Sequence, residues 1–331
     1  MTASPAIPDD GRPANPGGGV DSPRPLHPAG RALRQVAVIG DGTGHGPPAQ
    51  PGRPLATILA GDAATLQRLA RIPAVTRPAS QWDATDTVAE QIRQFPPEIT
   101  AVLLTRTSPT RARSVQRLVE QAGGRPVLTD EDATAIALTA AALVYLRGLG
   151  RDQYRARILI ADATRMPILS ALLLATGFPD ITLWNTPDAA WFPLHRAARD
   201  ADVVIDLQHA PDSNPTGSNP MGAPALGEQG ELSAVGFELD RPEGSVITPR
   251  ALDDGRMLIA PGLLRALAEY PATAPPLGLG IYEAVARAVA HATPARRRLH
   301  GVPDRDPATG TPDVADAIAG AVTLHLALTR P

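Results

Sequence analysis

Short apolar or β-branched runs alternate with helical stretches along most of this chain, and this alternation constrains its fold more than any other feature. The first series comprises QVAVI, TAVLLT and PVL within residues 35–128, separated by helical stretches such as DTVAEQIRQF. The second comprises RILIA, ITLW and DVVID within residues 157–206. Such alternation is typical of βαβ units around a parallel sheet. The sequence therefore predicts an α/β protein, with an N-terminal α/β domain followed by a Rossmann-like, doubly wound parallel-sheet domain.

Composition divides the chain into a tail and two domains. Residues 1–33 are crowded with Pro, Gly, Ala and Asp and show no apolar period, which predicts a disordered tail. We place the N-terminal α/β domain at 34–130 and the Rossmann-like domain, of the NAD-binding type, at 131–331. The latter contains a stretch rich in Gly, Pro, Asn and Ser at 210–245, which predicts a long surface loop.

The residue types present exclude several kinds of chemistry. The 31 basic residues are all Arg, so no lysine can form a Schiff base, act as a general base or serve a P-loop. The absence of Cys excludes disulfides, thiolate catalysis and cysteine-ligated zinc, and suits a reducing compartment. The net charge of -3 argues against a nucleic-acid surface. No signal peptide is recognisable, and no apolar run reaches the roughly 20 residues of a membrane helix. We expect a cytoplasmic protein that binds neither nucleic acid nor membrane.

The densest carboxylate cluster is Asp130-Glu131-Asp132, at the start of a long apolar helix for which Thr129 or Asp130 is the expected N-cap. Three oxygen ligands together suit a hard cation. Acidic side chains at a helix N-terminus also interact favourably with its dipole and cap free N–H groups. Since no second carboxylate is obvious elsewhere, and no pair of histidines has metal-ligand spacing, we favour the structural role and predict no metal site.

The turn from Ala161 to Met166, ADATRM, lies where a dinucleotide-binding sheet keeps its glycines, yet it contains none. Its side chains keep the backbone away from a pyrophosphate, and Asp162 adds negative charge there. Arg165 is the one residue that favours a phosphate. We therefore interpret the segment as a structural strand–turn–helix in which Thr164 caps the helix.

The order of these pieces resembles a known family. The stretch from AEQIRQFPPEITAVLLTRTSPT through RPVLTDEDATAIALTAAALVYLRGLG to RILIADATRM is similar to the central part of bacterial-type malic enzymes. The likeness extends back to VAVIGDGTG and forward to MLIAPGLLRALAEY. It implies oxidative decarboxylation of malate to pyruvate and CO₂ by a homodimer that needs NAD or NADP and Mg²⁺ or Mn²⁺.

The functional positions implied by this resemblance have mostly changed their chemistry. The metal-binding Glu-Asp pair of the family corresponds to Thr105 and Arg106, and its third carboxylate to Asp130 and Glu131. The lysine base corresponds to Arg53, which stays protonated and cannot accept a substrate proton.

The remaining family features are also altered. The segment most similar to the family's Tyr-Thr-Pro-Gly, which carries the tyrosine acid, is LHPAG at 26–30, and it has no tyrosine. The glycine-rich nucleotide loop corresponds to ADATRM, so Asp162, Thr164 and Arg165 form a vestigial cofactor loop. The acidic residue expected to bind the ribose corresponds to Asn185.

Three hypotheses follow. Metal polarisation, proton transfer and cofactor orientation act on one transition state, so their joint loss predicts a non-catalytic homologue with a binding or regulatory role. Alternatively, a repurposed or residual NAD(P)-linked oxidoreductase or lyase acts on a malate-like organic acid, with Arg53 and Arg106 binding the anion and Asp130 or Glu131 as general base. A third hypothesis retains NAD binding through Thr164 and Arg165. The expected partners are a second copy of the chain and either a small organic acid or another protein.

Overall fold

The computed structural model describes residues 34–44, 53–208, 245–252, 255–270, 277–294 and 313–329. The tail predicted at 1–33 lies outside these residues, and so does the loop predicted at 210–245, apart from Ser245. None of the helices within the described ranges combines the length and apolar character needed to cross a membrane.

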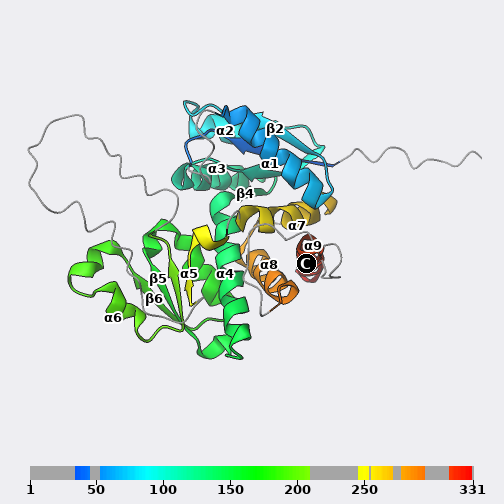
Figure 1. Ribbon diagram of the computed structural model, residues 1–331. Coiled ribbons are helices and arrows are strands. Elements are labelled where there is room, and N and C mark those ends of the chain that lie inside the picture. Colours follow the sequence, from blue (N-terminus) through cyan, green and yellow to red (C-terminus); the bar gives the residue numbers. More distant parts are fainter. Residues whose placement is uncertain are drawn as a thin grey trace, which may run out of the picture. The chain divides into compact units, whose positions relative to one another are not determined.

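The first half of the chain forms a parallel four-stranded sheet in the order β2-β1-β3-β4 (Figure 1). Val38 of β1 pairs with Thr76 of β2 and Leu103 of β3, and Leu103 pairs with Leu128 of β4. The strands and the helices that connect them are β1 (Gln35–Gly40), α1 (Leu55–Ala70), β2 (Ala74–Pro78), α2 (Thr85–Arg93), β3 (Ile99–Leu104), α3 (Pro109–Gln121) and β4 (Val127–Thr129).

Both faces of this sheet are covered, which explains why β1 and β3 are apolar at successive positions. Val36 and Val38 face one core, together with Leu59 of α1. The alternate residues Ala37 and Ile39 face another, which α2 and α3 cover. The continuous apolar run in the sequence thus indicates a strand buried on both sides.

The second sheet is also parallel, in the order β6-β5-β7-β8. Ile158 and Ile160 of its central strand contribute to the core that contains α5, whereas Leu159 and Ala161 pack with Trp184 and with α6. The elements are β5 (Arg157–Ala161), α5 (Pro167–Ala175), β6 (Asp180–Trp184), α6 (Leu194–Ala198), β7 (Val203–Asp206) and β8 (Val246–Ile247). In the described part of the chain, four short 3-10 helices accompany them: η1 (Gln153–Arg155), η2 (Ala163–Arg165), η3 (Thr186–Ala190) and η4 (Pro249–Leu252). The predicted fold class, mixed α/β with two parallel sheets, is confirmed.

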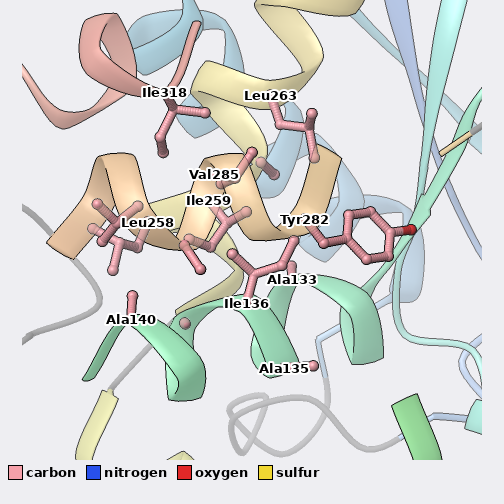
Figure 2. Packing of buried hydrophobic residues seen from close by; sticks show 14 of the residues in the cluster. Ala133, Ala135, Ile136, Ala140, Leu258, Ile259, Leu263, Tyr282, Val285 and Ile318 are labelled. Atoms are coloured by element: carbon pink, nitrogen blue, oxygen red, sulfur yellow. The ribbon is translucent and has the colours of Figure 1, made fainter. Parts of the chain in front are cut away.

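The long helix α4 (Asp130–Gly148) is buried along most of its length, and its small side chains let other helices approach closely. It contacts α7 (Gly255–Glu269) and α8 (Leu279–Ala292), and both of these contact α9 (Val314–Leu328). Figure 2 shows this packing: Ala133, Ile136 and Ala140 of α4 lie near Ile259 of α7 and Val285 of α8.

Thr129 begins α4 as predicted, through a capping box. Its hydroxyl accepts from the Asp132 N–H at 3.1 Å, and Asp132 Oδ2 accepts from the Thr129 N–H at 3.2 Å. The domain boundary predicted at residue 130 falls at the junction of β4 and α4, and it stays a prediction.

Candidate functional site

Strands β1, β3 and β4 end at the same edge of the first sheet because all three are parallel. Ligands of open α/β sheets bind outside this carboxyl edge, at the switch point where the strand order reverses. Here that point lies between β1 and β3. The residues that follow the strands, Asp41, Thr105 and Asp130, therefore define the candidate site.

Asp130 is bound to the two residues that the sequence resemblance matches to a metal-binding pair. Its Oδ2 accepts from the Thr105 hydroxyl at 2.9 Å and from the Arg106 backbone N–H at 2.8 Å. Arg106 has a φ of 55°, a left-handed conformation that is uncommon for residues other than glycine. The structure thus brings together Arg106 and Asp130, two positions that the sequence resemblance assigns to one site.

Two arginines converge on Asp62, a residue of α1 that the sequence analysis did not single out. Arg256 donates from Nη1 to Asp62 Oδ2 at 3.2 Å and from Nη2 to Oδ1 at 3.1 Å. Arg106 Nε lies 3.5 Å from Asp62 Oδ2. Arg256 Nη1 also donates to Thr105 Oγ1 and lies 3.7 Å from Asp130 Oδ1. We call Asp62, Thr105, Arg106, Asp130 and Arg256 the arginine–aspartate cluster.

This cluster is largely shielded from water, apart from the Asp130 side chain, which is 31% exposed, and it contains equal numbers of the two charges. The side chains of Arg256, Arg106 and Asp62 are 5%, 10% and 11% exposed. Its two carboxylates face two guanidinium groups. Removing one charge from such a buried arrangement leaves its partner uncompensated and lowers stability.

The other acids near this edge are also paired with arginine. Glu131 Oε2 lies 3.0 Å from Arg113 Nε, and Asp41 Oδ2 lies 2.7 Å from Arg111 Nε. Arg53, by contrast, is exposed just before α1, and within the described ranges no contact joins it to the cluster.

The loops after β1 and β3 are in direct contact at the switch point. The Gly44 N–H donates to the Arg106 carbonyl at 2.9 Å, and the Ser108 N–H donates to Thr43 Oγ1 at 3.0 Å. A Cβ atom on Gly44 would lie 2.6 Å from the backbone of Thr107. Backbone and side chains of this protein therefore occupy the space between these loops.

The residues of this edge do not fit a divalent metal. The positions of the family's metal pair hold a hydroxyl and a guanidinium, and Arg256 adds a second guanidinium beside Asp130. Within the described ranges, no group of three or more His, Cys, Asp or Glu side chains is arranged to hold a metal ion. A divalent cation would meet repulsion from both arginines.

The turn after β5 brings together all four residues of the predicted vestigial cofactor loop. Asp162 is buried and left-handed, with a φ of 64°, and its carboxylate pairs with Arg165. Asn185 follows β6, and its Oδ1 accepts from the Thr164 N–H at 3.1 Å. A backbone donor that could face a phosphate is thus bound to Asn185.

The predicted capping role of Thr164 is wrong. Helix α5 begins at Pro167, its N-cap is Met166, and Ala163–Arg165 form the separate 3-10 helix η2. Proline fixes φ at a helical value and has no N–H, so it is favoured at the first helical position. Thr164 therefore lies in the turn before the helix.

A second polar group, behind the edge, combines Asp132 with Gln116 and Tyr282. Gln116 Nε2 donates to Asp132 Oδ2 at 2.8 Å. Burial raises the pKa of Asp132, although hydrogen bonds from Thr129, Gln116 and Tyr282 oppose the shift. Burial, and then the charge of Asp132, raises the pKa of Tyr282 well above its ordinary value. Tyr282 extends from α8 among the apolar side chains around α4 (Figure 2). The group thus joins α3, α4 and α8, and Asp132 has the structural role predicted for it.

Comparison with known proteins shows which fold this is. No protein-family model matches the chain, and no curated protein matches it. Among solved structures, the malic enzyme of Entamoeba histolytica is 17% identical with a TM-score of 0.62, covering 90% of this chain and 70% of that one. The malic enzyme of Pyrococcus horikoshii is 16% identical with a TM-score of 0.63, covering 90% and 77%. The NAD-dependent malic enzyme of Thermotoga maritima is 14% identical with a TM-score of 0.61, covering 88% and 84%. The chain therefore has the malic enzyme fold, as the resemblance in its sequence predicts.

Proposed function

We propose that this protein is a non-catalytic form of the malic enzyme fold, which acts by binding or regulation and does not turn over malate. The observation that carries the proposal is the burial and ion pairing of the Arg106 side chain. This residue stands where the family resemblance implies a metal ligand, and its buried guanidinium is paired with Asp62. A metal ligand has been replaced by part of an internal ion pair.

Electrostatics gives the size of the effect. Two unit charges 4 Å apart interact by about 4 kcal/mol at an effective dielectric constant of 20. A divalent ion near one guanidinium would therefore be repelled by about 8 kcal/mol, and Arg256 adds a second guanidinium beside Asp130. The carboxylates Asp62 and Asp130 are already balanced by these two arginines and supply little net attraction for a metal.

The turn after β5 supports the same proposal for the cofactor. Dinucleotide binding needs backbone N–H groups that are open to a pyrophosphate. In this turn the Thr164 N–H donates to Asn185, and Asp162 places a carboxylate beside it. The third hypothesis, NAD binding through Thr164 and Arg165, would require this turn to rearrange.

The alternative of a repurposed oxidoreductase or lyase receives less support. It assigns Arg106 to the binding of an anionic substrate, but the side chain is only 10% exposed and pairs with Asp62. It also assigns Asp130 or Glu131 as a base, whereas Asp130 accepts two hydrogen bonds and Glu131 pairs with Arg113. A cytoplasmic location and a homodimer remain part of our proposal, supported by the composition and by the family resemblance.

The test is turnover and binding with the full chain. We expect no formation of NADH or NADPH from malate in the presence of Mn²⁺, and no heat of binding for NAD⁺, NADP⁺ or Mn²⁺ in calorimetry. A turnover of about 1 s⁻¹ or more, within the range of ordinary enzymes, would overturn the proposal.

The alternative has its own diagnostic. Saturable binding of malate that is lost in Arg106→Ala and kept in Arg93→Ala would favour a repurposed site. Arg93 is a suitable control because its ion pair with Glu90 is exposed on α2.

A further inference from the structure

We propose that Arg256 is a tethered cation that fills a guanidinium-shaped site between Asp62 and Asp130, and that removing its side chain leaves a site for a free guanidinium ion. Arg256 would hold this place whether or not the protein turns over malate. The site is formed by residues from separate elements, and the arginine supplies only the cation.

The contacts of Arg256 define the shape of the site. Its two terminal nitrogens meet the two oxygens of Asp62 at 3.1 and 3.2 Å, the forked geometry that suits a planar guanidinium. Nη1 also donates to Thr105 Oγ1 and lies 3.7 Å from Asp130 Oδ1. One planar ion therefore faces four oxygen atoms from three parts of the fold.

The walls of this site do not depend on Arg256 for their positions. Asp62 lies within α1, and Thr105 directly follows the buried strand β3. Asp130 begins α4 and is held by the Thr105 hydroxyl and the Arg106 N–H. A truncated Arg256 would leave these groups in place around a cavity of guanidinium size.

Charge balance selects a monovalent ion over a divalent one. Loss of the Arg256 guanidinium would leave Asp62 its ion pair with Arg106, whose Nε lies 3.5 Å from Asp62 Oδ2, and would remove the guanidinium that lies 3.7 Å from Asp130 Oδ1. The cavity would therefore hold one positive charge fewer than the native cluster. A guanidinium ion would restore both the missing positive charge and the N–H donors. Mn²⁺ would bring one positive charge too many and would lie near the guanidinium of Arg106. Sodium supplies the charge without the hydrogen bonds.

The experiment compares wild type, Arg256→Ala and Arg265→Ala in thermal melts with guanidinium chloride, sodium chloride, urea or manganese chloride at low, sub-denaturing concentration. Arg265 is a matched control on the same helix, because its partner Asp316 is half exposed. We expect guanidinium to raise the melting temperature of Arg256→Ala saturably, by about 3 °C or more. The other solutes should give no such rise, and guanidinium should give none in the other two proteins.

The following outcomes would overturn or support the inference. Equal responses in Arg256→Ala and wild type, or a larger response to Mn²⁺ than to guanidinium, would overturn the inference. If Arg256→Ala does not fold alone, its refolding yield is measured after dilution into each solute. A yield that rises with guanidinium and not with sodium chloride supports the tethered cation, and an unchanged yield refutes it. The double variant Asp62→Asn/Arg256→Ala should show no response in either assay.

Discussion

Asp62→Asn tests how the carboxyl edge of the first sheet is held together. Asp62 accepts two hydrogen bonds from Arg256 and also faces Arg106. Asparagine has nearly the same shape but no charge, and an NH2 group, which is a donor, replaces one of the two carboxylate oxygens. The substitution therefore leaves two guanidinium groups facing a neutral side chain, with little change in packing.

The expected cost follows from burial. Removing one partner of a buried ion pair costs about 3–5 kcal/mol, since an uncompensated charge stays in a poorly hydrated place. Asp130 compensates in part because it lies 3.7 Å from Arg256. Arg106 loses its ion pair with Asp62 as well, which offsets that compensation. We expect a loss of about 3–5 kcal/mol, a large share of the 5–15 kcal/mol typical of native proteins. The melting temperature should fall by about 4–7 °C.

Urea unfolding followed by circular dichroism measures this loss, with an unchanged m-value as the sign that the unfolding reaction is the same. Asp316→Asn is the matched control: it removes a half-exposed carboxylate that pairs with Arg265, and it should cost less than about 1 kcal/mol. If Asp62→Asn costs no more than this control, the cluster does not hold the edge together and the reasoning is wrong.

Four further predictions concern single positions near the site and in the core. Gly44→Ala should lower the free energy of unfolding by about 1–3 kcal/mol, because its Cβ would lie 2.6 Å from the Thr107 backbone. Gly61→Ala, in α1 where a Cβ meets nothing within 4 Å, should raise it by about 0.5–1 kcal/mol, and urea titration measures both. Asp132 has a raised folded-state pKa, so its stabilisation is complete below the ordinary value of 3.8 and is lost as the pH rises through the folded pKa. Asp132→Asn should therefore gain stability relative to wild type over that pH range, and a constant difference would contradict the shift. Phe178→Ala empties a fully buried position and should cost about 3–5 kcal/mol in thermal or urea unfolding, whereas a loss below about 1 kcal/mol would mean that the site collapses.

Much of the fold follows from the sequence because local signals and tertiary packing agree. The runs in β1 and β3 are apolar at successive positions since both faces of the sheet are covered. Thr129 and Asp132 satisfy free backbone groups at the start of α4, which is a local matter that spacing reveals. The error at Thr164 has a local cause as well: Pro167 is favoured at the first helical position, so the helix begins there and Thr164, three residues earlier, lies before the N-cap.

The site was predictable only where topology sets it. Residues that follow parallel strands meet at one edge, so the contact of Thr105 and Arg106 with Asp130 could be expected. Asp62 and Arg256 are 194 residues apart, and no periodic pattern links them. One signal was present: Arg256 directly precedes the apolar run MLIA, and a buried guanidinium there needs a carboxylate.

Two features of this edge are physically linked: the residues Thr105 and Arg106 at the positions where the resemblance implies metal ligands, and the presence of Arg256 beside Asp62. A buried carboxylate such as Asp62 needs a nearby cation, and at a metal site the ion supplies that charge. Where the ligand positions hold Thr105 and Arg106, the charge has to come from the protein, and in a sequence without lysine only arginine keeps it at any working pH. Arginine also meets both oxygens of one carboxylate, as Arg256 does with Asp62. Replacing Arg106 by the acidic residue that the resemblance implies would therefore not create a metal site by itself, because Arg256 would still occupy the space between Asp62 and Asp130. A variant designed to bind a metal at this edge would need both guanidinium groups removed.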